Sequence, residues 1–156
     1  MADLKFTKST DDGQTWSTST IDSGGGVGDF TSATSPTSGT IYISYRDISL
    51  GDLNFAKSID DGQTWSTSTI DTSGAGKWTS ITSPTSGTIY ISYREHISGN
   101  NLKFAKSEDA GQTWNITVIQ PCGDTDTSIS SPTVNNIFIS YYDDTSEDLK
   151  FAKYIP

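Results

Sequence analysis

An eight-residue pattern occurs three times in this chain at an even spacing. The stretches STDDGQTW, SIDDGQTW and SEDAGQTW end at Trp16, Trp65 and Trp114, so consecutive copies lie 49 residues apart (65 − 16 and 114 − 65). The flanking segments repeat as well: DLKFTKS, DLNFAKS and NLKFAKS precede the copies, and TIYISYR, TIYISYR and NIFISYY lie between and after them. A period of this length is typical of repeat architectures, so we expect residues 1–156 to form one array with no separate domain or linker.

The composition excludes a thick aliphatic core, because only 32% of the 156 residues are hydrophobic. Apolar residues come in short alternating sets, with the 14 glycines and 5 prolines falling between them. This favours strands and turns over disorder. Aromatic residues, 11% of the chain, are expected to supply much of the buried surface.

The chain is acidic, with a formal net charge of −9 and an isoelectric point near 4.3. Without a basic patch to neutralise phosphates, nucleic acid and anionic membrane surfaces are excluded as partners. The first residues, MADLKF, run straight into a strand pattern, so no signal peptide is expected. No stretch approaches the roughly 18 apolar residues of a membrane span. The cellular compartment is left open.

Each period is predicted to contain four strands separated by turns. In the second period the strand patterns cover 76–84, 88–94, 101–107 and 113–119, with turn signals such as SPTSG and EHISGN between them. No window has the 3.6-residue periodicity of a helix. The period therefore predicts a four-stranded antiparallel sheet in which each strand pairs with the next.

Such a sheet has two apolar faces and cannot bury either one by itself, so successive sheets must pack face to face. Radial stacking gives a β-propeller, an all-β fold in which each sheet is a blade. The small side chains of the first strand, such as Ser80, Thr82 and Ser83, suit the crowded innermost position. The large aromatic side chains suit the outer part, where the wedge widens.

The repeated pattern itself is predicted to be a rigid turn between the third and fourth strands. Gly62 can take a positive φ at little cost, and the Asp60 carboxylate can accept hydrogen bonds from N–H groups of its own turn. Ser58 and Thr64 can close the turn, and Trp65 can start the outer strand with its ring against the sheet.

The pattern S-x-D-x-G-x-T-W resembles the Asp-box, also called the BNR repeat, of sialidases, sortilin-type receptors and lectin-like propellers. All three copies keep the Ser, Asp, Gly, Thr and Trp. The resemblance implies a structural turn on the rim, remote from the ligand, with no catalytic role for its aspartates. The residues that it marks as structural are Asp11, Gly13 and Trp16, then Asp60, Gly62 and Trp65, and finally Asp109, Gly111 and Trp114.

The resemblance does not extend to sialidase chemistry. Sialidases hold the substrate carboxylate with three arginines and use a tyrosine nucleophile helped by a glutamate, with an aspartate as acid/base. This chain has two arginines, Arg46 and Arg94, at equivalent positions of consecutive repeats, and it lacks the F/Y-R-I-P motif of the family. One chain cannot supply the arginine triad.

The array begins and ends in the third type of strand, with DLKFTKS at 3–9 and DLKFAKYIP at 148–156. This leaves about three blades and one surplus strand. Three blades cannot close a ring, since propellers typically have 4 to 8 blades and an open arc would expose two apolar faces. We expect homo-oligomerisation to close the ring, and a six-bladed C2 dimer is favoured over a nine-bladed trimer.

In such a dimer one blade combines strands of two chains. The segments TSISSP, NIFISYY and DLKFAKY of one chain would be completed by the Trp16 strand of the other. DLKFTKS and DLKFAKY would then compete for one place, and the sequence does not decide between them. A fragment of a longer propeller or an engineered chain is an alternative, because the first two repeats are nearly identical.

Ligands of such propellers usually bind where the loops after the second and fourth strands share one face. These loops differ most between the repeats. Trp78, beside a cluster of polar residues, could stack on a sugar ring and hydrogen-bond its hydroxyl groups. The alternative is that Trp78 fills the gap between blades, as Phe30 would at the aligned position. The predicted ligand-binding residues are Arg46, Asp47, Trp78, Arg94, Glu95, His96, Tyr142 and Asp143.

Three acids, Asp47, Glu95 and Asp143, recur at one position of each repeat. Paired carboxylates are what a glycosidase needs, so a glycoside-processing enzyme is a second hypothesis. The alternative is that each acid caps its own turn or meets an arginine. No metal-binding spacing is present, so no metal or other cofactor is expected.

His96 and Cys122 are the single histidine and the single cysteine. We expect His96 in a solvated loop rather than as a base or metal ligand, and Cys122 as a loop thiol without an intrachain disulfide. The sequence thus favours a non-enzymatic, self-assembling propeller module that binds carbohydrate. The alternatives are a glycoside-processing enzyme and a structural fragment without a ligand.

Overall fold

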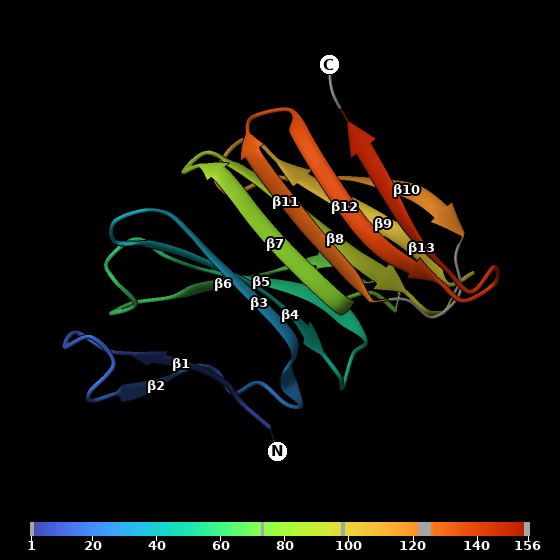
Figure 1. Ribbon diagram of the computed structural model, residues 1–156. Helices are drawn as coiled ribbons and strands as arrows, with labels where there is room; N and C mark the ends of the chain where they lie inside the picture. Colours follow the sequence, from blue (N-terminus) through green and yellow to red (C-terminus); the bar gives the residue numbers. More distant parts are fainter. Residues whose placement is uncertain (1, 73, 98, 122–125, 155–156) are drawn as a thin grey trace.

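The computed structural model describes residues 2–72, 74–97, 99–121 and 126–154, and all regular elements among them are β-strands (Figure 1). The first sheet holds β1 (Leu4–Lys8) and β2 (Ser17–Asp22). The second holds β3 (Val27–Thr37), β4 (Thr40–Asp47), β5 (Asp52–Ser58) and β6 (Ser66–Asp71). The third holds β7 (Lys77–Thr85), β8 (Thr88–Glu95), β9 (Asn101–Ser107) and β10 (Asn115–Pro121). The fourth holds β11 (Thr127–Thr133), β12 (Asn136–Asp143) and β13 (Asp148–Tyr154).

All strand pairs are antiparallel, and within each sheet every strand pairs with the next one in sequence. The prediction of four-stranded antiparallel sheets is therefore confirmed for the second and third sheets. We call the four sheets blades 0 to 3, in chain order. Blade 0 has only the third and fourth strands of a blade, and blade 3 lacks the fourth.

The blades stack in sequence order. The first strands β3, β7 and β11 lie next to one another, and Figure 1 shows the β1–β2 hairpin at one end of the stack and β11–β13 at the other. Short hydroxyl side chains link these strands: the backbone N–H of Ile81 donates to Ser32 Oγ, and that of Ile129 donates to Ser80 Oγ, each at 3.2 Å. Small residues at this position let neighbouring backbones approach.

The apolar core is divided into layers, one between each pair of blades. Side chains alternate along each second strand, so that one set faces the blade before and the other the blade after. Between blades 1 and 2, for example, Phe55 and Tyr42 pack with Ile81, Ile91 and Tyr93. Each layer is thin, which is how a chain with few aliphatic residues still buries its apolar side chains.

The repeated turn has the same geometry in all three copies. In the second copy, Ser58 Oγ donates to Asp60 Oδ1 at 2.7 Å and accepts from the Gly62 N–H at 2.9 Å. The Thr64 N–H donates to Asp60 Oδ1 at 2.9 Å, and the Thr64 hydroxyl donates to Oδ2 at 2.6 Å. Asp60 thus fixes the turn by charge-assisted hydrogen bonds.

The turn also joins its blade to the preceding one. The Trp65 ring meets the Phe6 ring edge-on with centroids 5.1 Å apart, and the same pair recurs as Trp114 and Phe55 at 5.2 Å. Gly62 has a φ of 80°, and a Cβ atom there would lie 2.4 Å from Phe6 Cε1. The glycine is needed both for its conformation and for the space it leaves to the phenylalanine.

We predict that Gly62→Ala lowers the free energy of unfolding by about 1–3 kcal/mol, through strain at a positive φ and displacement of the Phe6 ring. Gly87→Ala is the matched control, because its Cβ atom would meet nothing closer than the Glu108 carbonyl oxygen at 3.8 Å. That variant is expected to stay within about 0.5 kcal/mol of the wild type. Urea unfolding measures both values, and equal losses would contradict the prediction.

We also predict that acid destabilises the chain through the turn aspartates. Hydrogen bonds from Thr64 and Ser58 lower the pKa of Asp60 from 3.8 to about 2. Since the folded pKa is depressed, this stabilisation is complete above pH 3.8 and is lost as the pH falls toward 2. Melting temperatures between pH 5 and 2 should therefore fall less steeply in Asp60→Asn than in the wild type. Parallel slopes in the two proteins would refute the assignment.

Candidate functional site

The loops after the second and fourth strands meet on one face of the stack. The N–H of Ile48, after β4, donates to the Gly26 carbonyl oxygen at 2.7 Å, and the N–H of His96, after β8, donates to that of Gly74 at 3.0 Å. We call this side the loop face. The repeated turns do not lie on the loop face; they lie beside the β3–β4 and β7–β8 hairpins. The Asp61 N–H donates to the Gly39 carbonyl oxygen, and the Ala110 N–H donates to the Gly87 carbonyl oxygen.

Trp78 is the centre of an aromatic and cationic cluster near the loop face. Its ring lies 5.2 Å from the Phe30 ring. The Arg94 guanidinium carbon lies 5.3 Å from the Trp78 ring centroid, and Lys77 Nζ lies 5.4 Å from it. Phe30 and Trp78 both have positive φ, 49° and 48°. Bulky residues rarely adopt this conformation, and such strain is concentrated at functional sites.

The polar groups around this ring make a locally cationic patch on an acidic chain. Arg46 Nη1 lies 3.8 Å from Asp29 Oδ2. Burial, followed by repulsion from Arg94 and Arg46, lowers the pKa of Lys77. Arg46 Nε and His96 Nδ1 are buried and have no hydrogen-bond partner among the described residues. Buried polar atoms of this kind need a partner from water or a ligand.

The three recurring acids face into their own loops. Asp47 Oδ1 accepts the N–H groups of Ser49 and Leu50, at 2.7 and 3.1 Å. Glu95 Oε1 accepts the Ile97 N–H at 2.6 Å, and its Oε2 accepts from the Asn101 amide.

Asp143 is arranged in the same way. Its carboxylate contacts Lys150 and accepts the Thr145 hydroxyl and N–H, and these hydrogen bonds, that from Lys150 first, hold the pKa of Asp143 well below the usual range. All three side chains are buried. As buried turn caps, these carboxylates are placed to order the loops rather than to face a substrate.

The remaining predicted residues are spread over the loop face. Arg94 is only 2% exposed, so its guanidinium backs the Trp78 ring instead of projecting into solvent. His96 is half-buried rather than solvated. Tyr142 is exposed on β12, the middle strand of blade 3, whereas Phe30 and Trp78 belong to blades 1 and 2. Cys122 lies outside the described residues.

The described residues hold no group of three or more His, Cys, Asp or Glu side chains placed to bind a metal ion. No helix with the length and apolarity of a membrane span occurs in the described part of the chain.

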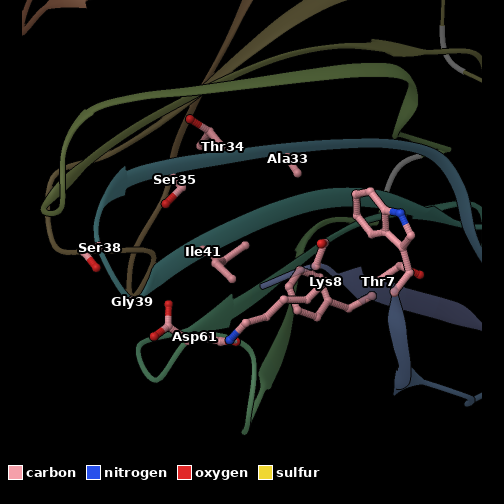
Figure 2. Close-up of a pocket in the computed structure, with 12 residues that line it drawn as sticks. Thr7, Lys8, Ala33, Thr34, Ser35, Ser38, Gly39, Ile41 and Asp61 are labelled. Atoms are coloured by element: carbon pink, nitrogen blue, oxygen red, sulfur yellow. The ribbon is translucent and has the colours of Figure 1, made fainter. Parts of the chain in front are cut away.

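A hollow of about 520 Å³ lies between blades 0 and 1, and no sequence motif predicted it. Figure 2 shows Lys8 and Thr7 of β1 on one side of it and Ala33, Thr34 and Ile41 on the other. Phe6 and Trp16 also line it. In a complete blade the first and second strands would fill this space, and blade 0 has neither.

No protein-family model matches the sequence, and no curated protein matches it either. Solved structures do match. A mutant of the NanB sialidase from Streptococcus pneumoniae aligns with a TM-score of 0.63 and 16% identity over 95% of this chain and 27% of that chain. NanB in complex with a chlorobenzyl-ammonio-ethanesulfonate gives a TM-score of 0.62, 18% identity and 98% coverage of this chain.

A fucose lectin from Kordia zhangzhouensis, in complex with methyl-fucoside, aligns with a TM-score of 0.51 and 16% identity over 80% of this chain and 95% of that chain. At these identities the likeness shows the fold alone. The chain spans about 27% of the length of the sialidase chain. The β-propeller fold is confirmed by these likenesses, and closure of the ring by a second copy stays a prediction.

We predict that His96 titrates below its ordinary pKa of 6.5, first because burial disfavours the charged imidazolium and then because Lys77 and Arg46 repel it. A pH titration followed by NMR isolates this residue, since it is the only histidine. In Lys77→Gln the pKa should rise but stay below that of the chain unfolded in urea. A folded-state pKa at or above the unfolded value would contradict the burial.

Proposed function

We propose that the chain is a non-enzymatic, carbohydrate-binding propeller module whose ring is completed by a second copy. The binding site is the loop-face cluster around Trp78. The observation that carries this proposal is the strained Trp78 ring, which contacts Phe30 and lies beside Arg94 and Lys77. A fixed aromatic ring next to hydrogen-bond donors is what a sugar needs, since its C–H face stacks on the ring while its hydroxyl groups take the donors.

The unsatisfied donors support the same reading. Arg46 Nε–H can only donate, and it is buried without an acceptor among the described residues. A sugar hydroxyl or an ordered water at this position would satisfy it, and Lys77 offers further donors beside the ring. The fold likeness to a fucose lectin is consistent with a sugar ligand, although at this identity it carries no residue of that site over.

The enzymatic alternative has less support. A glycosidase needs two carboxyl groups facing the bond to be cleaved. Asp47 and Glu95 instead spend their oxygen atoms on N–H groups of their own loops. We therefore assign both acids to loop order.

We predict that Trp78→Ala weakens binding of any glycan recognised by the wild type by about tenfold or more, because the stacking surface is lost. A fluorescently labelled chain on a glycan array identifies the ligand, and titration calorimetry gives the affinity. Ile59→Ala is the control: Ile59 is 70% exposed beside the repeated turn and should leave binding unchanged.

An array without a bound glycan, or a Trp78→Ala variant with unchanged affinity, would contradict the proposed site. Hydrolysis of a chromogenic glycoside that disappears in Glu95→Gln would contradict the non-enzymatic assignment and favour the glycosidase.

A further inference from the structure

Some contacts between neighbouring blades form twice inside the stack. At its two ends the same contacts are incomplete: one end exposes one partner and the other end exposes the other. Between blades 1 and 2, the Thr79 hydroxyl bonds the Ser44 hydroxyl at 2.8 Å, and between blades 2 and 3 Thr127 bonds Ser92 at 2.8 Å. The next partners in the repeat are Thr31, on β3, and Ser140, on β12. Both are exposed, whereas Ser44 and Ser92 are completely buried.

The same relation holds along the second half of β3. Its residues Thr31, Ala33 and Ser35 are exposed, while Ile81, at the position of Ala33 on β7, is buried. The face of β3 that is left open borders the hollow in Figure 2. This face is therefore built like an interior one but has no blade against it.

In the complete blades, an aromatic side chain of the second strand occupies the place that corresponds to this hollow. Between blades 1 and 2, Tyr42 packs on Phe55 and its hydroxyl donates to the Ser86 carbonyl oxygen at 2.5 Å. Phe138 is the residue of β12 at the position of Tyr42. Phe6 and Ser38, which correspond to Phe55 and Ser86 in the repeat, line the hollow. By analogy with Tyr42, Phe138 of a second copy would pack into this hollow.

Trp16 is a third group that lacks the partner its counterparts have. Trp65 and Trp114 are covered by Phe6 and Phe55 of the preceding blade, whereas Trp16 is 63% exposed. The repeat gives Phe104 as its partner; Phe104 lies on β9 of blade 2, next to the last blade of the stack. Polar, apolar and aromatic contacts thus all pair the beginning of the stack with its end.

We infer that the β1–β2 hairpin of a second copy binds the β12 edge of the first and takes the place of β13. This rests on the proposed closure by a second copy and adds which strands form the shared blade. The shared blade consists of β11 and β12 from one copy with β1 and β2 from the other. In the uncombined chain β13 covers the β12 edge, which would otherwise be open to unwanted strand pairing.

Burial favours β1 over β13 for the shared position. Leu4 is 3% exposed and already packs under blade 1, where its Cα would lie 2.9 Å from a Cβ on Gly28. Leu149, at the same position of β13, is 81% exposed. For β13 to take the place, Leu4 and Phe6 would have to leave contacts that each copy has already formed, whereas β13 gives up little burial.

The turn chemistry agrees. Ser9, at the end of the β1 segment, donates to Asp11 Oδ1 at 2.8 Å and accepts the Gly13 N–H at 2.9 Å. The residue of the β13 segment at that position is Tyr154, which cannot make these bonds in the same space. A blade built with β13 would break the turn that leads into β2.

The exchange also preserves the charge pair on β12. Both segments begin Asp-Leu-Lys-Phe, so Lys5 takes the register position of Lys150 opposite Tyr141. Lys150 contacts the buried Asp143 carboxylate. Lys5, which otherwise contacts only exposed groups, can replace it there. Asp143 is therefore not left as an unpaired buried charge.

The first measurement is the mass of the wild-type chain by size-exclusion chromatography with light scattering at several concentrations. The expected value is near twice 16.8 kDa. A mass of one chain at every concentration would overturn closure and with it the exchange, and a mass of three chains would overturn the two-copy ring. Neither result bears on glycan binding, which the array tests separately.

Two cysteine pairs then distinguish the strands, each in a Cys122→Ser background. Phe138 pairs with Lys153 of β13 in the free chain, and with Lys8 of the second copy after exchange. In the dimer fraction, a short bismaleimide should link Phe138→Cys to Lys8→Cys between chains. It should not link Phe138→Cys to Lys153→Cys within a chain. The reverse pattern would show that β13 keeps its place and would overturn the exchange.

Leu149→Asp gives an independent readout in the full-length chain. If β13 leaves the shared blade, Leu149 stays in solvent and the dimer dissociation constant should change by less than about threefold. If β13 is retained, Leu149 is buried against the second copy, and a buried unpaired charge should weaken the dimer more than about a hundredfold. The second result would overturn the exchange.

Discussion

Blades 1 and 2 are each held by a phenylalanine ring that the preceding blade supplies. Phe6 lies against Gly62 and Trp65, and the contact recurs one blade later. Because the glycine has no side chain and a positive φ, the ring reaches the backbone of the turn itself. A turn that lacks this ring keeps its tryptophan in solvent, as Trp16 does. The stability of one blade is thus coupled to the presence of the blade before it, as in other repeat proteins.

Polar bonds do much of the work that aliphatic packing does in other domains. Where the first strand of one blade meets the second strand of the blade before it, hydroxyl groups such as those of Thr79 and Ser44 pair. On the rim, the Asp60 carboxylate fixes its turn by accepting from three groups of its own segment. Buried polar groups are tolerated here because nearly all are paired, and unpaired atoms such as Arg46 Nε stand out against that background.

The two rims of the stack differ in how much they vary. The turns that carry Asp11, Asp60 and Asp109 are alike in sequence and geometry, because the same aspartate and threonine hydrogen bonds close each of them. The loop face is under no such constraint, and blade 2 carries Trp78 where blade 3 carries Asp126. Recognition can therefore differ from blade to blade while the packing between blades stays the same.

The sequence by itself determined the strands, their antiparallel order and the turn geometry, because these depend on residues close together in the chain or repeated along it. It also identified Trp78 as the centre of a candidate site. The tertiary structure decided what depends on groups from different blades: that Asp47 and Glu95 are buried caps, that Arg94 backs the Trp78 ring, and that Phe30 and Trp78 are strained. It also decided which terminal strand is firmly seated, since the burial of Leu4 and the exposure of Leu149 follow from the neighbouring blade and not from their identical local sequence.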